Sequence, residues 1–115
     1  MAEVELAGTS WVVASLDEGS VPEDDPPTIA FDDERVSGST GVNRFTGGWE
    51  LANGVLVLTP LATTRMAGPA ERMELERRYL AVLEGRCTVY VHGDGLTLRS
   101  DGGSLELRAR NPDKT

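Results

Sequence analysis

The sequence predicts a mainly β (α+β) fold, in which an antiparallel sheet of about eight strands curls into a partial barrel or a sandwich around one packed α-helix. Three observations support this prediction. Short segments in which apolar and polar residues alternate recur along the chain, as in strands with one buried face. Turn residues such as Asn53-Gly54 separate neighbouring segments. The stretch 69–83 alone has the apolar period of an amphipathic helix.

The expected strands before the helix are linked by polar turns and span residues 8–16, 28–31, 35–40, 43–51 and 55–58. Alternation in the fourth of these places Phe45, Trp49 and Leu51 on one face. After the helix, turns at 93–95 and 101–103 divide three more strands. Their alternation predicts inward side chains at Cys87, Val89, Val91, Leu96, Leu98, Leu105 and Leu107, and outward ones at Thr97, Arg99, Glu106 and Arg108.

The 115 residues support a single domain, 1–115, with a core from about residue 6 to about residue 110. The single cysteine, Cys87, has no partner for an intramolecular disulfide, and its place on an apolar strand face indicates an unreactive core residue. No apolar run reaches the roughly 20 residues of a membrane span, so we expect no membrane insertion. The chain shows no signal peptide and no lipobox cysteine, so we expect a cytoplasmic protein, and we expect it to be a monomer.

The charge of the chain argues against two classes of partner. A formal net charge of −8 disfavours nucleic acid and an anionic membrane surface, since binding to either requires clustered Lys and Arg side chains. Residues 1–54 carry eleven acidic side chains and two arginines, whereas residues 55–115 are nearly neutral. Two interpretations of the acidic loop 17–27 and the turn 32–34 stay open: they keep the protein soluble, or they dock a basic protein partner.

The sequence carries no recognisable catalytic or metal-binding motif. The glycine-rich segment 38–48 lacks the Lys-Ser/Thr pair and the following helix of a phosphate-binding loop, so we interpret it as a tight turn. Its glycines permit positive φ, and Asn43 tolerates the left-handed region and can bond the backbone of its neighbours. His92 is the single histidine, and the sequence places no nucleophile beside it. One histidine and one cysteine do not make a metal site. We therefore expect no enzyme activity, no metal and no cofactor.

Glu76 interrupts the apolar half of the predicted helix. A carboxylate in that position is costly unless it is hydrogen-bonded or paired. One interpretation is a buried anchor that accepts hydrogen bonds from backbone amides or from Asn43, Thr64 or Arg65. The other interpretation is a functional group with a shifted pKa in a pocket.

Four segments of the chain form a recognisable series. Trp11 ends the sequence GTSW, residues 38–45 are GSTGVNRF, and residues 64–68 are TRMAG. In the predicted helix, Glu76 is followed after two residues by Tyr79-Leu80 and then by Leu83. The last three are similar to the patterns GxxGCNxF, TxMAC and ExxFLxxL, so the chain resembles the META domains, the family that includes the heat-shock protein HslJ. The motif residues, to which we assign a structural role, are Gly38, Thr40, Gly41, Asn43, Phe45, Thr64, Met66 and Glu76.

The resemblance implies a compact β structure with one packed helix, stress-linked or envelope-linked roles in bacteria, and no known catalytic activity. The chain departs from the family pattern at Val42 and Gly68. The family often has cysteine at these two positions, and the members with these cysteines are commonly exported proteins. If those cysteines pair in relatives, this chain has lost both partners together, which agrees with a reducing compartment.

We expect a non-enzymatic, stress-related module that interacts with an unknown protein partner. The alternative is a carrier that holds a small apolar ligand between sheet and helix, which requires a cavity of about 300 Å³ or more. The side chains expected to line that cavity are Trp11, Phe45, Trp49, Met66 and Met73. The candidates for contact with a ligand or partner are Trp11, Arg44, Trp49, Arg65 and Met73.

Overall fold

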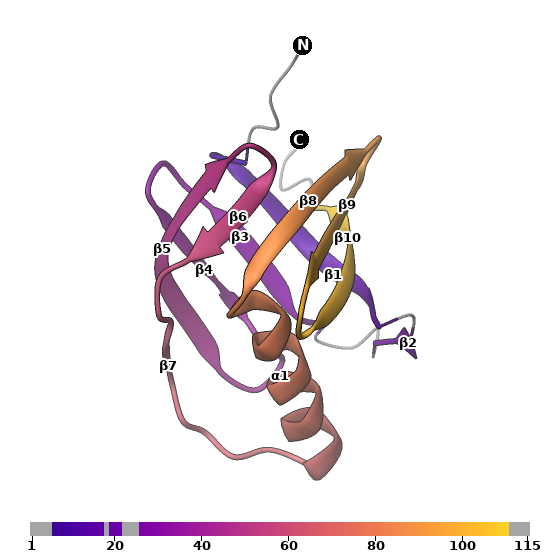
Figure 1. The fold of residues 1–115 in the computed structure, drawn as a ribbon. Helices are drawn as coiled ribbons and strands as arrows, with labels where there is room; N and C mark the ends of the chain where they lie inside the picture. The colour runs from indigo at the N-terminus through magenta and orange to yellow at the C-terminus, as the bar shows by residue number, and fades with distance from the viewer. Residues whose placement is uncertain (1–5, 18, 22–25, 111–115) are drawn as a thin grey trace.

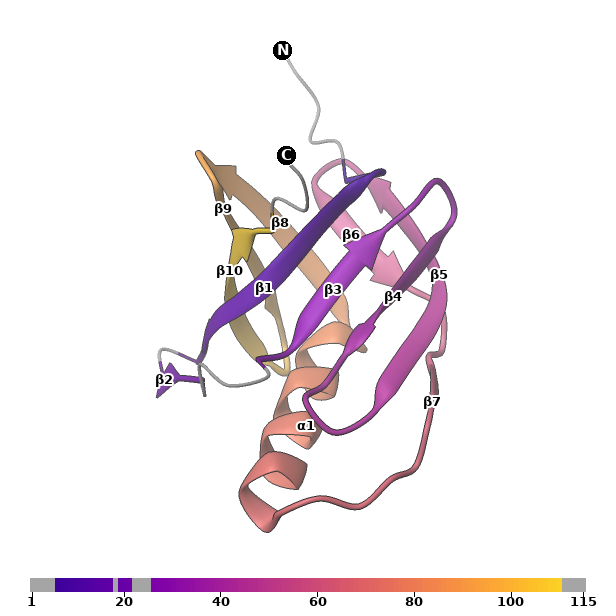
Figure 2. The same cartoon turned by 180° about the vertical axis from the view of Figure 1, so that it is seen from behind.

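The computed structural model describes residues 6–17, 19–21 and 26–110, and it confirms the mainly β fold with one helix (Figure 1). Eight antiparallel strands follow one another around a barrel in the order β1-β3-β4-β5-β6-β8-β9-β10. Pairing of β10 with β1 closes the barrel and decides between the two predicted architectures (Figure 2). The strands are β1 (Thr9–Leu16), β3 (Thr28–Phe31), β4 (Arg35–Ser39), β5 (Arg44–Ala52), β6 (Val55–Leu58), β8 (Arg86–His92), β9 (Gly95–Ser100) and β10 (Gly103–Ala109).

Two further strands of two residues each adjoin the barrel, and the sequence does not predict them. β2 (Gly19–Ser20) pairs with the end of β1, and β7 (Ala62–Thr63) pairs with β5. Segments of this length are too short to display a period. β7 matters for the site because it begins the connection from the barrel to the helix.

Positive φ angles mark the turns between strands. The β5–β6 hairpin turns at Asn53 (φ 54°) and Gly54 (φ 79°), as the Asn-Gly pair predicts. Gly41 has φ 95° in the β4–β5 turn, which explains the glycine at that position. Asn43 was expected to use the left-handed region as well, but the described non-glycine residues with positive φ are Asp17 and Asn53. Asn43 therefore has a different role.

Helix α1 (Ala70–Leu83) lies against one end of the barrel (Figure 1). Its C-terminal part is buried, since Tyr79, Val82 and Leu83 are inaccessible to solvent. Met73 and Leu75 are half-buried, because the N-terminal turns project beyond the strands (Figure 1), and Leu80 nearer the C-terminal end is half-buried as well. In the described part of the chain, no helix has the length and apolar character needed to cross a membrane.

Two residues of the C-terminal strands depart from their predicted sides. Val91 is 47% exposed, because β6 pairs with residues 86–88 of β8 and leaves the rest of that edge uncovered. Thr97 is 7% exposed although alternation places it outside. Its neighbours cover it: the Thr97 hydroxyl donates to Glu106 Oε1 at 2.9 Å and lies 3.0 Å from His92 Nε2.

The core fills the barrel interior with aliphatic side chains from every long strand. Cys87 belongs to this core, and burial raises the pKa of its thiol to about 11. The thiol is therefore protonated at neutral pH, which makes it a poor nucleophile and a poor metal ligand. This is the environment that the sequence predicts for an unreactive cysteine.

Candidate functional site

A hydrogen-bonded cluster joins the β4–β5 turn to helix α1. Thr40 Oγ1 donates to Glu76 Oε2 at 2.8 Å, and Asn43 Nδ2 donates to the same oxygen at 2.8 Å. Thr40 Oγ1 also accepts hydrogen bonds from the backbone amides of Val42 and Asn43. Thr40 and Asn43 are buried, so water does not compete for these bonds and the turn is held in one position.

Asn43 extends the cluster to the segment that leads into the helix. Its Oδ1 accepts hydrogen bonds from Thr64 Oγ1 at 2.9 Å and from the Met66 amide at 2.6 Å. Its Nδ2 donates to Met66 O at 3.1 Å as well as to Glu76. An asparagine amide has two acceptor and two donor positions, and all four are used here. We expected Asn43 to bond its neighbours in the turn and gave it as one possible donor to Glu76. Its side chain does donate to Glu76, and it also bonds Thr64 and Met66 in the segment before the helix.

Glu76 has one of the partners that the sequence predicts, Asn43, and one that it does not, Thr40. Among the described residues, its donors are Thr40 and Asn43, and neither a backbone amide nor Thr64 nor Arg65 donates to it. Thr64 donates a hydrogen bond to Asn43 instead, so Asn43 links Thr64 to Glu76. The Glu76 side chain is half-buried and also lines a hollow of about 450 Å³ between residues 61–67 and α1.

Gly38 and Phe45 of the motif serve the packing between sheet and helix. The Phe45 ring meets Tyr79 edge-on with centroids 5.9 Å apart, and Tyr79 OH donates to Thr28 O at 2.9 Å. A Cβ atom at Gly38 would lie 2.1 Å from Thr28 O and 2.7 Å from Phe45 Cζ. Glycine therefore leaves the room in which the aromatic ring reaches the helix.

Val42 and Gly68, where the family pattern often has cysteine, are neighbours in the structure. A Cβ atom built on Gly68 lies 3.9 Å from Val42 Cβ, close to the mean separation of about 3.8 Å between bridged cysteines. Gly68 has no positive φ, so an L side chain is not strained there. The two positions thus have the spacing that a disulfide requires.

We expect the double variant Val42→Cys/Gly68→Cys to form a disulfide on oxidation and to unfold at a higher urea concentration, because the bond restricts the unfolded chain. Thiol titration in denaturant should then detect Cys87 alone, and dithiothreitol should reverse the gain in stability. The single variant Val42→Cys is the control. Three titratable thiols after oxidation would show that the two positions do not meet.

The aromatic side chains proposed for a ligand pocket are used in packing. Trp11 is 6% exposed in the core, and its Nε1 donates to Thr9 Oγ1. Trp49 is half-buried against Phe31, with ring centroids 5.2 Å apart, and its Nε1 donates to Asp32 O. Among the described residues, no cavity between sheet and helix is lined by Trp11, Phe45 and Trp49 together. Of the remaining candidates, Arg65, Met66 and Met73 line the 450 Å³ hollow.

The described part of the acidic region has structural partners. The backbone amide of Ser104, followed by the Arg78 guanidinium 3.2 Å away, holds the pKa of Asp17 below its ordinary value. The amides of Arg35 and Glu34 do the same for the pKa of Asp32, at 2.7 and 3.0 Å from Oδ1. Residues 18 and 22–25 of the loop lie outside the described residues. Asp17 and Asp32 thus hold turns together, which the sequence does not reveal.

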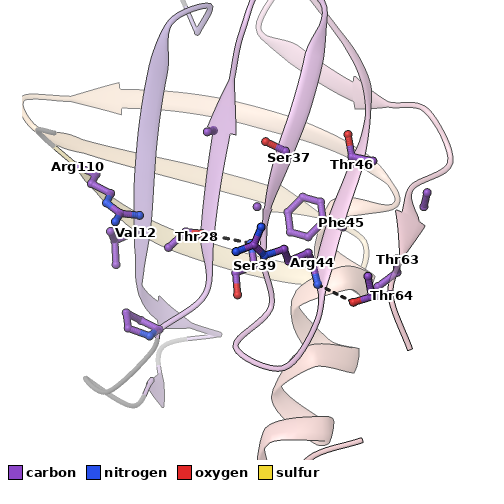
Figure 3. Close-up of a pocket in the computed structure, with 14 residues that line it drawn as sticks. Val12, Thr28, Ser37, Ser39, Arg44, Phe45, Thr46, Thr63, Thr64 and Arg110 are labelled. Atoms are coloured by element: carbon purple, nitrogen blue, oxygen red, sulfur yellow. Dashed lines mark hydrogen bonds between the residues drawn. The ribbon is translucent and has the colours of Figure 1, made fainter. Parts of the chain in front are cut away.

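A groove of about 1060 Å³ lies on the outer face of β1, β3, β4, β5 and β7 (Figure 3). Its floor consists of short side chains, which stand on alternate positions of the strands and point away from the core. These are Val12, Thr28, Ala30, Ser37, Ser39 and Thr46.

Two arginines, Arg44 on β5 and Arg110 after β10, stand on either side of that floor. Figure 3 shows both guanidinium groups directed over it, Arg44 beside Ser39 and Arg110 beside Val12. The sequence predicts Arg44 as a contact residue, but it gives no reason to select Arg110 or the floor. Those residues become neighbours through strand pairing, which alternation alone does not specify.

Among the described residues, no three side chains of His, Cys, Asp or Glu gather closely enough to hold a metal ion. The 14 residues that line the groove include no acidic residue, no histidine and no cysteine. The described lining of the groove therefore presents cations, hydroxyl groups and small apolar surfaces.

Comparisons with known proteins agree with the fold. A family model described as META domain matches residues 4–112. No curated protein matches the chain significantly. A protein solved by NMR is similar over 90% of both chains, with 30% identity and a TM-score of 0.77. A protein from Burkholderia xenovorans, also solved by NMR, is 28% identical over 91% of this chain and 83% of its own, with a TM-score of 0.74.

A more distant structure shares the fold alone. It is a DUF4847 family protein from Bacteroides vulgatus, solved by crystallography. It is 13% identical over 94% of this chain and 96% of its own, with a TM-score of 0.65. The arrangement of strands and helix therefore persists where little of the sequence is shared.

Proposed function

The chain belongs to the META domain family, and on that basis we propose that it is a non-catalytic binding module whose contact surface is the groove on the outer face of β1, β3, β4 and β5. The protein partner docks on this groove and not on the acidic loop. A stress-related role is part of the proposal through the family resemblance.

The observation that carries the proposal is the contrast between the motif cluster and the groove. In the cluster, Asn43 has every hydrogen-bonding position occupied by this chain, so it has none to offer a ligand. In the groove, the Arg44 and Arg110 side chains and the Ser37 hydroxyl have no hydrogen bond or ion pair among the described residues. Free polar groups around a hollow are what recognition of a partner requires.

The chemistry of the described lining residues supports the non-catalytic part of the proposal. Hydroxyl groups of Ser37 and Ser39 need an adjacent base to act as nucleophiles. Among the described residues, neither a histidine nor a carboxylate lines the groove beside them. His92, the single histidine, lies on β8 and contacts Thr97 instead.

We expect peptides selected from a random library of about 12 residues to bind the groove. In ¹⁵N spectra of the labelled protein, such a peptide should shift the amide signals of Thr28, Ala30 and Ser37. Ser37→Trp fills the floor from an exposed strand position and should weaken binding at least tenfold while the urea midpoint is kept.

Thr88→Trp is the matched control, because Thr88 is an exposed residue of β8 outside the groove. Its effect on binding should be negligible. Selected peptides that shift signals elsewhere, or that bind wild type and Ser37→Trp equally, would contradict the groove as the contact surface.

A further inference from the structure

We propose that the groove takes an acidic, extended segment of a partner protein, held by arginines at both ends of the floor. The inference rests on the proposed function and adds the chemistry of the partner to it. It depends on three features of the described residues: the order of side chains across the sheet, the unpaired state of the arginines, and the distance between the two ends.

Strand pairing sets the first feature, a row of outward side chains that crosses the barrel wall. Arg108 on β10 pairs with Val12, and Val12 pairs with Thr28. Thr28 pairs with Ser39, and Ser39 pairs with Arg44 on β5. The row therefore has an arginine at each end and three short, uncharged side chains between them.

A second row runs beside the first and repeats its pattern. Ser10 pairs with Ala30, Ala30 with Ser37, and Ser37 with Thr46. At one end the Arg110 amide donates to Ser10 O, and at the other Arg35 Nη2 donates to Thr46 Oγ1 at 3.2 Å. Each end of the floor thus carries two arginines, Arg108 with Arg110 and Arg35 with Arg44.

The second feature is that three of these four arginines have no acidic partner in the part of the chain that the structure describes. Among the described residues, the side chains of Arg44, Arg108 and Arg110 make no ion pair, and Arg35 contacts a hydroxyl group. A guanidinium group binds a carboxylate through two parallel hydrogen bonds, so a carboxylate is the natural ligand for each end.

The third feature, distance, selects a protein segment over a small anion. Four strand steps of about 4.8 Å separate β10 from β5, which places the two ends roughly 19 Å apart along the curved surface. A single small anion contacts one end only. An extended chain rises about 3.3 Å per residue, so about six residues connect the ends. The short side chains of the floor let its backbone approach closely.

The test uses a fluorescent peptide of about eight residues with Asp-Glu at each end and Ser, Ala and Thr between. A matched peptide carries Asn-Gln at both ends. In anisotropy titrations at low salt, the acidic peptide should bind at least tenfold more tightly than the amide peptide. Its affinity should fall as salt is added, because ionic contacts at the surface are screened.

Arg44→Gln and Arg110→Gln should each lower the affinity for the acidic peptide about fivefold, and the double variant should lower it more than either single variant. Arg86→Gln and Arg99→Gln are matched controls, since both arginines are exposed on β8 and β9 outside the groove. These two variants have the same change in net charge and should leave the affinity within twofold of wild type. Urea midpoints show whether all variants keep the fold.

Three outcomes would overturn the inference. An equal loss of affinity for the acidic peptide in the groove variants and in the control variants would mean that the peptide is attracted by the overall charge and not by the groove. Equal binding of a peptide with acids at one end only would remove the second contact. If the acidic peptide fails while library-selected neutral peptides still bind the floor, the acidic partner is wrong and the proposed function stands. If no peptide binds the groove, both fail.

Discussion

Asn43→Ala is expected to lower the free energy of unfolding by about 3–4 kcal/mol, because it leaves several buried groups without partners. The variant removes the acceptor of the Thr64 hydroxyl and the Met66 amide, and the donor to Met66 O and Glu76. Asn43 is 3% exposed, so water does not replace these bonds readily. Urea unfolding followed by tryptophan fluorescence measures the loss.

Glu76→Ala provides the comparison for that variant. It removes one of the partners of Asn43 and should cost about 1–3 kcal/mol. The double variant should cost less than the sum of the two single losses, because both changes break the same contact. Glu76→Gln keeps an acceptor oxygen for Thr40 and Asn43 and should recover most of the stability. A loss below about 0.5 kcal/mol for Asn43→Ala would mean that the cluster is not a structural element.

Gly38→Ala should be destabilising by about 3 kcal/mol, because the added methyl group collides with backbone atoms. It would lie 2.1 Å from Thr28 O and 3.0 Å from Ile29 Cα. Ile29 pairs with Gly38 across β3 and β4, so relief of the collision separates the two strands. Movement of Thr28 also disturbs its hydrogen bond from Tyr79 OH, which ties β3 to the helix.

Gly85→Ala is the matched control for that substitution. A Cβ atom there makes an ordinary contact of 3.4 Å with Ser100 Cβ, and the backbone has no positive φ. Its effect should stay below about 1 kcal/mol. Similar unfolding free energies for the two alanine variants would show that β3 and β4 are not packed as closely as the structure places them.

The motif residues could be found in the sequence, but their roles only in part. The glycines of residues 38–48 were expected to permit positive φ, and Gly41 is the one among them that has it. Asn43 was expected to act within its own turn and was one possible donor to Glu76, yet all its side-chain partners lie 21 to 33 residues away. A side chain with free donors and acceptors bonds whatever the fold brings near it. That outcome depends on packing and is not encoded in the residues beside it.

The candidate site was less predictable than the fold. Trp11 and Trp49 were expected to contact a ligand because they are large and apolar, but packing uses Trp11 in the core and Trp49 against Phe31. The groove instead consists of small and polar residues, which draw no attention in a sequence. Arg44 was a candidate, and its counterpart Arg110 follows the last strand.

Local patterns in the chain are enough to predict the eight long strands, the single helix and the turn at Asn53-Gly54, because alternation, helical period and backbone freedom are properties of neighbouring residues. Three features follow only from packing in three dimensions: β10 pairs with β1 to close a barrel, Asn43 connects the turn to both the helix and residues 64–66, and arginines from the two halves of the chain border one groove. They depend on strand register, which is fixed by the burial of whole faces and so involves residues far apart in the chain.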